Sequence, residues 1–573
     1  MTHIGQPRRR VEDRPLLLGA GRFTDDLRLP GTLHVSLVRS VHAHARVAAI
    51  DTTAARGAPG VVDVVTGADL AGVGSIGFNP TFPRMKVAPH PALVLGVVRA
   101  VGEPVAAVVA ETAAQARDAA DLVAVAYEPR PPLMAPEAAV TDGEILHAEL
   151  GTNRAFSGMW KLGDVAAAFA SPAAVARVRV EQSRVSAVAM EGRAVLATHD
   201  RPLDELTVWC STQAPFRVRS ELANALDFPE SRIRVIAPDV GGGFGVKADP
   251  HREELLLAWL ALRLGRPVKW IATRMEDLLT TRHGRGLHAE GELAVDPDGR
   301  IRGVRARILT PLGSTLMFNA AVCGLNHARL LPNAYVVPAF DVESVGVYTT
   351  TTPTGPYRGA GRPEGVFLME RLMDEAAATL GLDPVEIRRR NFVAPDAFPY
   401  KNAAGFTYDS GNYAAALDKA LATAGYAGLR RAQAAARARG AIVGVGVSSY
   451  VENAALGWES GAVHVERTGA VTIVTGSSAH GQGHETTWAQ IAADALGIDP
   501  AQIAVRHGDT RGAPQGFGTT GSRSTALGGS AVHRAAVEIR EKGRRIAAHL
   551  MEAAAADVVL AEGGFHVAGL PER

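Results

Sequence analysis

Short apolar runs separated by turn residues mark the first part of the chain. Three of these runs, at 33–38, 61–65 and 104–109, are typical of strands, and the alanine-rich stretch 113–122 is typical of a helix. The mixture predicts a small α+β domain within residues 1–140. The proline-rich stretch 129–142 at its end predicts a linker.

Apolar periodicity continues through the rest of the chain. A strand is expected at 233–240, and helices are expected at 253–263 and 366–380, the second closed by Gly381. Further on, the pattern predicts a charged helix over 414–439, a strand-like run at 444–448, and a helix that opens near Thr486 and ends before Gly497. These elements indicate two more α+β domains, at 150–405 and 408–573.

Composition fits this organisation and excludes several partner classes. At roughly 150 residues per domain, 573 residues allow three or four domains. The hydrophobic fraction is 47% and the net charge is +1, with no basic tract that would indicate nucleic acid. No apolar run reaches the roughly 18 residues of a membrane span, and none follows the basic start of the chain. We therefore expect no membrane association and a cytoplasmic location.

The two cysteines, Cys210 and Cys323, lie far apart and outside any C-x-x-C pattern. A cluster that needs four cysteine ligands is therefore excluded from this chain. If the protein does redox chemistry, its electrons leave through another subunit. Both cysteines are themselves expected to be small buried hydrophobic residues.

Four glycine-rich loops carry most of the candidate chemistry. They lie at 241–247, 355–362, 476–484 and 516–524, and we refer to them as the first to fourth loops. Glycine allows the backbone to approach a ligand closely and to turn successive N–H groups toward an anion. Together with Arg358, Arg362 and Arg523, these loops indicate one large, phosphate-bearing ligand.

The first loop follows a predicted strand and matches G-x-G-x-x-A at 243–248. A dinucleotide fingerprint also needs an acid about 20 residues further on. The stretch 263–269 carries none, and the next acid is Glu276. Lys247 also lacks the flanking residues of a phosphate-binding P-loop. A nicotinamide-dependent oxidoreductase is therefore a disfavoured alternative.

The third loop partly matches a zinc-binding motif, because His480 and His484 lie four residues apart and Glu485 follows His484. Zinc motifs of this kind need a regular helix, and Gly481 and Gly483 each cost up to about 1 kcal/mol in one. A loop that enters a helix near Thr486, with free N–H groups available to an anion, fits better. We assign no metal ligand among the side chains.

In this order, the loops resemble those of the large, molybdenum-binding subunit of the xanthine dehydrogenase, aldehyde oxidase and aerobic carbon monoxide dehydrogenase family. The resemblance covers nearly all of the chain. Residues 19–26 and 39–46 resemble the a/b hammerhead domain of the family. Its two cofactor-binding domains are matched at 190–193, 211–213, 241–247, 357–363, 481–484, 508–510 and 518–524. The implied fold is α+β: a hammerhead domain followed by two molybdenum-cofactor-binding domains, the second incomplete.

The resemblance also implies a cofactor and partners. Molybdenum would be held by molybdopterin, in bacteria usually the cytosine dinucleotide, and a small organic substrate would be hydroxylated with oxygen from water. Iron–sulfur clusters and FAD would belong to an iron–sulfur small subunit and an FAD-binding medium subunit. By position, Gln213 resembles the glutamine that hydrogen-bonds the apical oxo ligand of the metal. Phe244 and Gly245 resemble the residues beside the metal, and Arg358 lies on the loop that resembles the substrate-facing loop of the family. The cofactor-binding candidates are Gly241, Gly242, Gly243, Gly245, Gly359, Gly481, Gln482, Gly483, His484, Thr520, Gly521, Ser522, Arg523 and Ser524.

Three departures from the family narrow this expectation. The family's catalytic glutamate lies near the end of a longer subunit. We therefore expect this glutamate on a C-terminal remainder of the subunit, which is either a separate chain or missing. Residues 1–573 should have little activity without that remainder. The second loop has Gly359-Ala360-Gly361 where carbon monoxide enzymes carry a copper-binding cysteine, and Ala248 stands where purine-oxidising relatives carry a glutamate. Carbon monoxide and purines are therefore disfavoured as substrates, which leaves aldehydes, N-heteroaromatics and similar small organic molecules. The alternative is a non-catalytic cofactor-binding or assembly paralogue.

Overall fold

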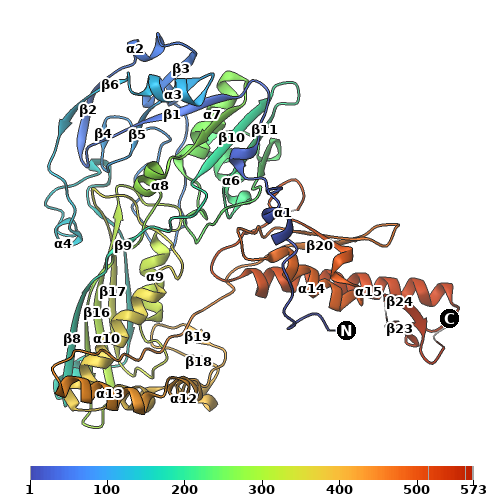
Figure 1. The fold of residues 1–573 in the computed structure, drawn as a ribbon. Coiled ribbons are helices and arrows are strands. Elements are labelled where there is room, and N and C mark those ends of the chain that lie inside the picture. Colours follow the sequence, from blue (N-terminus) through green and yellow to red (C-terminus); the bar gives the residue numbers. More distant parts are fainter. Residues whose placement is uncertain (1, 514, 562, 571–573) are drawn as a thin grey trace.

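The structure is a computed structural model that describes residues 2–513, 515–561 and 563–570. The last residues of the expected third domain, 571–573, lie outside the described residues. Figure 1 shows three lobes: an upper lobe in blue and green, a lower lobe in green and yellow, and a lobe in orange and red. No helix among the described residues combines the length and apolar character needed to cross a membrane.

The upper lobe is built on a seven-stranded sheet with the order β12-β11-β10-β13-β1-β5-β3. Its strands are β1 (Leu33–Arg39), β3 (Val61–Thr66), β5 (Pro104–Ala110), β10 (Ala194–Asp200), β11 (Glu205–Cys210), β12 (Ile233–Ile236) and β13 (Val268–Ile271). β1 pairs in parallel with β13, with Leu33 opposite Val268. Strands from the expected domains 1–140 and 150–405 therefore share one sheet, and backbone hydrogen bonds join the two segments.

Helices cover this sheet and bury its core. They are α2 (Thr53–Arg56), α3 (Ala113–Ala120), α6 (Pro215–Leu226), α7 (Arg252–Leu264) and α8 (Arg274–Thr280), and α1 (Asp13–Leu17) precedes the sheet. Leu256 and Leu260 of α7 belong to the same buried cluster as Val195, Val208 and Trp270 of the strands. A small sheet of β2 (Ala45–Asp51), β4 (Val97–Val98) and β6 (Ala124–Pro129) completes the segment 1–140. The expected linker contains the short helix α4 (Pro136–Ala139).

The lower lobe is a five-stranded sheet with the order β7-β17-β16-β15-β8. Its strands are β7 (Arg154–Leu162), β8 (Ala174–Glu181), β15 (His288–Val295), β16 (Ile301–Gly313) and β17 (Phe340–Tyr348). The helices of this lobe are α5 (Val165–Ala170), α9 (Ala321–Leu330), α10 (Arg362–Leu380), α11 (Pro384–Asn391), α12 (Tyr413–Ala424) and α13 (Tyr426–Ala438). Two short strand pairs complete it: β9 (Arg184–Val185) with β14 (Gly284–Arg285), and β18 (Tyr400–Lys401) with β19 (Thr407–Tyr408). Leu368 and Leu372 of α10 pack into the core of the sheet.

Two predictions for this region were wrong. The single helix over 414–439 is broken at Gly425, whose φ of 62° ends α12 before α13 begins. The run at 444–448 forms no strand. Side chains bond the backbone around it, since Gln433 donates to Val443 O and Glu370 accepts from Ser449 N. Side chains therefore make the hydrogen bonds to the backbone of this segment that a neighbouring strand would make in a sheet.

The third lobe packs α14 (His484–Leu496) and α15 (Ser530–Leu550) on a sheet of β20 (Gly461–Val465), β21 (Val471–Thr475) and β22 (Ile503–Arg506). Trp488, Ile473 and Val532 lie at its core. A π-helical turn, Ser524–Gly529, leads into α15, and the hairpin β23 (Val558–Ala561) with β24 (Gly564–Val567) follows. The lobe joins the upper sheet where Ala237 N donates to Gly508 O at 2.7 Å, just beyond the end of β12.

Candidate functional site

Gln213, which follows β11 closely, joins three of the four loops. Its side chain is 2% exposed, and its Oε1 accepts hydrogen bonds from Gly245 N at 2.8 Å and Lys247 N at 3.3 Å. Its Nε2 donates to Thr519 O at 2.8 Å. Its carbonyl accepts from Thr519 N at 3.0 Å and from Ser478 Oγ at 3.3 Å. One buried amide residue therefore ties the first, third and fourth loops together.

The first loop also holds the second loop. Phe244 has φ 53°, and its carbonyl accepts from Arg358 N at 2.9 Å. Gly245 has φ 98°, and a Cβ there would lie 2.9 Å from Pro356 O. The Phe244 ring is 42% exposed and Arg358 is exposed as well. Both side chains named as catalytic candidates on these loops therefore point away from the protein interior and are open to a ligand.

The second loop is held in place by contacts with Arg285 and helix α9 of the lower lobe. Arg285 donates to Tyr357 O at 3.0 Å and to Arg358 O at 2.7 Å. Gly361 has φ 90°, and a Cβ there would collide with the carbonyl of Cys323 in α9. Gly359, with φ 101°, packs on Pro363. The loop therefore needs glycine where it touches its support, and its course is set by the lower lobe.

Glu459 joins the third and fourth loops, and no motif in the sequence points to it. Its carboxylate accepts from Ser477 Oγ at 3.0 Å, from Phe517 N at 3.3 Å and from Arg523 Nη1 at 2.8 Å. Where the two loops cross, a Cβ on Gly516 would lie 2.5 Å from Gly476 Cα. Only the folded structure reveals this residue, because its partners lie 18 to 64 positions away in the sequence.

Two arginines expected to face phosphate use their guanidinium groups inside the protein. Arg523 is 1% exposed and donates to Leu456 O at 2.9 Å and Gly518 O at 2.8 Å, in addition to its ion pair with Glu459. Arg362 donates to Gly359 O at 2.9 Å and lies 3.4 Å from Glu452. In this structure both side chains shape the loops. Of the three loop arginines, Arg358 is the exposed one.

Several loop positions leave their backbone open. Gly481 has φ 111° and Gly521 has φ 60°, and no atom lies within 4 Å of where either Cβ would be. Ser522 follows with φ 55°, and Gly242 has φ 100°. Backbone in such conformations can present N–H groups to an anion without a side chain in the way. This open, donor-rich backbone fits an extended anionic ligand.

The start of α14 differs from the expectation. The helix begins at His484, and Thr486 N is not free for a ligand because it donates to Glu12 Oε1 at 3.2 Å. Burial lowers the pKa of His480 to about 3, with His484 adding to the effect, and burial lowers the pKa of His484 to about 4. Both rings are neutral at pH 7. Nδ1 of His484 is buried and has no hydrogen-bond partner among the described residues, so its hydrogen-bonding capacity is unsatisfied.

The remaining candidates lie on the same loops. Gly241 N donates to Glu191 Oε2 at 2.8 Å, and the Cβ position of Gly243 is filled by the Gln213 amide. Gln482 is exposed and accepts from His480 N at 2.8 Å. Gly483 immediately precedes α14, Thr520 is half-buried, and Ser524 donates to Thr519 Oγ1 at 3.1 Å.

A buried ion pair lies beneath the first loop. Lys247 donates to Ser211 Oγ at 2.6 Å and to Glu191 O at 2.8 Å, and it lies 3.2 Å from Glu191 Oε2. Burial lowers the pKa of Lys247, while the charge of Glu191 acts against that shift. Sequence reasoning included these residues only as members of larger motifs. In the structure they hold the entry of the first loop.

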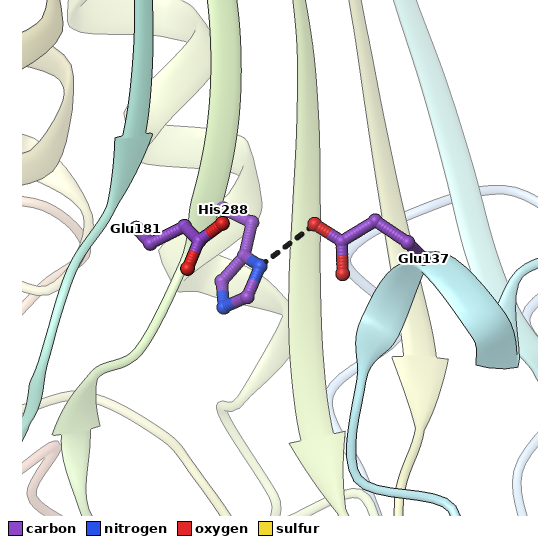
Figure 2. A group of neighbouring side chains, drawn as sticks. All are labelled: Glu137, Glu181 and His288. Atoms are coloured by element: carbon purple, nitrogen blue, oxygen red, sulfur yellow. Dashed lines mark hydrogen bonds and ion pairs between the residues drawn. The ribbon is translucent and has the colours of Figure 1, made fainter.

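Metal-ligand side chains gather elsewhere. Glu137, Glu181 and His288 from α4, β8 and β15 place their ligand atoms within 4.8 Å of one another, the only such group among the described residues (Figure 2). Arg179 already forms ion pairs with both carboxylates, at 2.8 Å from Glu181 and 3.6 Å from Glu137. The group belongs to the lower lobe, at the left of Figure 1.

A cavity of about 250 Å³ adjoins the second loop. It is lined by Asn79, Thr81, Val322, Leu325, Asn326, Arg329, Leu330, Phe406, Asn453 and Leu456. Asn326 donates to Ala360 O at 2.9 Å, and Asn453 accepts from Arg362. Two amide side chains that contact the second loop therefore also face a largely apolar space.

The chain is similar to known proteins along nearly its whole length. Residues 18–131 match the aldehyde oxidase and xanthine dehydrogenase a/b hammerhead domain, and residues 146–392 and 419–573 each match a molybdopterin cofactor-binding domain. The chain is 38% identical to the 6-hydroxypseudooxynicotine dehydrogenase complex subunit gamma of Paenarthrobacter nicotinovorans, over 100% of this chain and 73% of that protein. It is 37% identical to the nicotine 6-hydroxylase large subunit of the same organism, over 99% and 72%. A solved structure, quinoline 2-oxidoreductase from Pseudomonas putida 86, superimposes with a TM-score of 0.95 at 39% identity, over 100% of this chain and 75% of that one.

Proposed function

We propose a specific function for this chain from the family to which it belongs, the large, molybdopterin-binding subunits of the molybdenum hydroxylases that include xanthine dehydrogenase and carbon monoxide dehydrogenase. In this proposal the chain binds molybdopterin cytosine dinucleotide. When bound, the cofactor supplies a molybdenum centre for two-electron oxidation with oxygen from water. The electrons pass to an iron–sulfur partner subunit, with FAD on a further partner.

The convergence of the first, third and fourth loops on Gln213 is the observation that carries this proposal. Gly481 and Gly521 would approach the dinucleotide through their backbone, because nothing stands where their Cβ atoms would be. One N–H of the Gln213 amide bonds Thr519, and an amide nitrogen carries two. The second N–H is the donor we assign to the cofactor. His484 Nδ1, buried and neutral, is a further contact.

Phe244 and Arg358 are the residues we assign to the substrate side. The exposed Phe244 ring offers a flat apolar surface, and the Arg358 guanidinium offers several N–H donors beside it. The backbone bond from Arg358 N to Phe244 O keeps the two residues together. Phe244 would pack on a planar molecule, and Arg358 would hold a carbonyl oxygen or a ring nitrogen.

N-heteroaromatic compounds are the substrate class that this arrangement favours. Leu325, Leu330 and Phe406 give the adjoining cavity apolar walls, while Asn326 and Asn453 add amide groups that can bond a ring nitrogen. The similarity of the chain to nicotine 6-hydroxylase and to quinoline 2-oxidoreductase supports the same class. Aldehydes are the second class, because they present the same combination of a polar atom and an apolar body.

Carbon monoxide is disfavoured by the thiols of this chain. The tip of the second loop is Ala360, and the thiol nearest in the fold, Cys323, is buried behind Gly361. Burial raises the pKa of Cys323 to about 12, with Glu364 adding to the shift, so the thiol stays protonated at neutral pH. A protonated, buried thiol is a poor ligand for copper.

Replacing Gly521 with leucine tests the proposal, with Gly425→Leu as a matched control. Both glycines have φ near 60° and neither has an atom within 4 Å of its Cβ position, so leucine adds the same backbone strain of about 1–2 kcal/mol at each. Only Gly521 lies on a candidate cofactor loop; Gly425 joins two helices of the lower lobe. Each variant is produced with its partner subunits in a host that makes the cofactor, and molybdenum and released pterin nucleotide are measured.

We expect Gly425→Leu to retain wild-type molybdenum and Gly521→Leu to lose most of it, because the leucine side chain occupies the space of the ligand. Equal molybdenum in the two variants would show that this loop does not contact the cofactor. Wild-type protein that carries no molybdenum would refute the proposed function itself. Release of a pterin without cytidine would refute only the dinucleotide form.

A further inference from the structure

The first residues of the chain lie on the third lobe, although the residues that follow belong to the upper lobe. His3 N and Ile4 N donate to the carboxylate of Asp494, at 2.5 and 2.9 Å. Gln490 donates to His3 O at 2.8 Å. Figure 1 shows this segment in blue, running from α1 across α14. We refer to residues 3–13 as the N-terminal strap.

Glu12 on the strap caps helix α14. Its carboxylate accepts from Thr486 N at 3.2 Å and from Thr486 Oγ1 at 2.6 Å, and Val11 N donates to the same hydroxyl at 2.9 Å. The residue before the helix, Gly483, has no side chain with which to cap it. A carboxylate at a helix N-terminus satisfies a free N–H group and interacts favourably with the helix dipole. A residue 474 positions away in the sequence therefore does the work of a local cap.

Arg10 holds the loop that leads into this helix. Its Nη1 donates to Gly481 O at 2.8 Å, and its Cδ lies 2.8 Å from where a Cβ of Gly483 would be. Asp13, at 2.5 Å from Arg10 Nη2, fixes the guanidinium. The Gly481 carbonyl is thereby turned toward the strap. The opposite side of Gly481, where no atom lies within 4 Å of the Cβ position, stays open.

We propose that Arg10 and Glu12 are positioning residues for the cofactor: they hold the third loop in the conformation in which Gly481 and His484 meet the dinucleotide. This inference rests on the proposed function and extends it to a segment that no glycine motif includes. Glycine makes the third loop adaptable, so its shape has to be imposed from outside. Arg10 fixes the loop at Gly481 and Glu12 fixes it at the first turn of α14.

Charge-matched variants test this role. Arg10→Ala and Glu12→Ala remove the contacts, Arg10→Lys keeps one donor, and Glu12→Gln keeps an acceptor oxygen. Arg9→Ala is the control, because Arg9 is exposed on the same strap and carries the same charge as Arg10. Each protein is produced with its partner subunits in a host that makes the cofactor. Two quantities are measured: hydrogen exchange of residues 481–490, and the rate of molybdenum loss on dialysis.

Loss of a helix cap in Glu12→Ala, or of one hydrogen bond in Arg10→Ala, corresponds to about a fivefold change in an equilibrium. We therefore expect exchange and molybdenum loss each to be about fivefold faster in both variants. Arg10→Lys and Glu12→Gln should lie between these variants and the wild type, and Arg9→Ala should match the wild type. Faster exchange with an unchanged rate of molybdenum loss would overturn the inference, because the strap would then be structural only. Wild-type protein without molybdenum would instead overturn the proposed function, and the inference with it.

Discussion

Replacement of Gln213 by alanine is the sharpest test of the loop arrangement. The change removes the partner of three buried backbone groups: Gly245 N–H, Lys247 N–H and Thr519 C=O. Each buried polar group left without a partner costs about 1–3 kcal/mol. Water that enters the vacated space recovers part of this, so we take the lower end, about 3 kcal/mol for the three groups.

This free energy should appear locally, because the three groups belong to the first and fourth loops. At about 1.4 kcal/mol per factor of ten, 3 kcal/mol corresponds to an increase in loop opening on the order of 100-fold. Hydrogen exchange of peptides that cover 241–247 and 516–520 measures this opening directly. Because the loops define the proposed cofactor site, molybdenum content should fall in the same variant.

Gln433→Ala is the matched control for this experiment. Gln433 is also a buried glutamine, and it donates to one backbone carbonyl, Val443 O at 2.9 Å, in the lower lobe. Its replacement should speed exchange only near residue 443 and leave molybdenum content unchanged. If the first and fourth loops of Gln213→Ala exchange at the wild-type rate, the idea that Gln213 joins them is wrong.

Two further predictions concern buried positions of the scaffold. Burial, with the charge of Glu253 beside it, raises the pKa of Glu254 from 4.5 to about 7. Because the pKa of Glu254 is higher in the folded state than in the unfolded state, its contribution to the free energy of unfolding is complete below pH 4.5 and is lost as the pH rises through about 7. The free energy of unfolding falls by about 3 kcal/mol over this range. Glu254→Gln should therefore melt like the wild type near pH 5 and several degrees higher near pH 8, and an equal shift at both pH values would contradict the reasoning. Gly361→Ala places a Cβ against Cys323 O at a residue with φ 90°, and the backbone strain and overpacking should together destabilise the second loop by about 3 kcal/mol or more. Gly381→Ala is the control, because Gly381 has φ 66° and free space around its Cβ position, and it should cost about 1 kcal/mol. Equal melting temperatures of the two variants would refute this account.

Elements with strong local signals could be predicted from the sequence. The helix expected at 253–263 is α7, Arg252–Leu264, and the helix expected at 366–380 is α10, which begins four residues earlier at Arg362. The earlier start follows from Pro363, which is favourable in the first turn of a helix. The break at Gly425 was missed because alanine-rich periodicity runs through it. Only the positive φ of this glycine separates α12 from α13.

The glycine loops could be located from the sequence for the same reason: a glycine-rich stretch is a local signal. What supports these loops could not be found in this way. Glu459 and Glu12 act on residues that are far away in the chain, and isolated glutamates carry no pattern that marks them. The pairing of β1 with β13, which joins two expected domains in one sheet, is likewise a long-range event. Local patterns therefore located the glycine loops, and only the fold revealed what holds them.

The fate of the loop arginines bears on how an anion would be recognised here. Arg523 is neutralised by Glu459, and Arg362 lies beside Glu452, so neither brings a free positive charge to the loops. Recognition of a pyrophosphate would then rest mainly on backbone N–H groups of open glycines, which supply fixed dipoles and a defined direction for each hydrogen bond. Such a site selects its ligand by shape, because each donor is fixed by the fold. It also explains why the supports matter: Gln213, Glu459 and Glu12 touch backbone or neighbouring side chains, and they determine where those donors point.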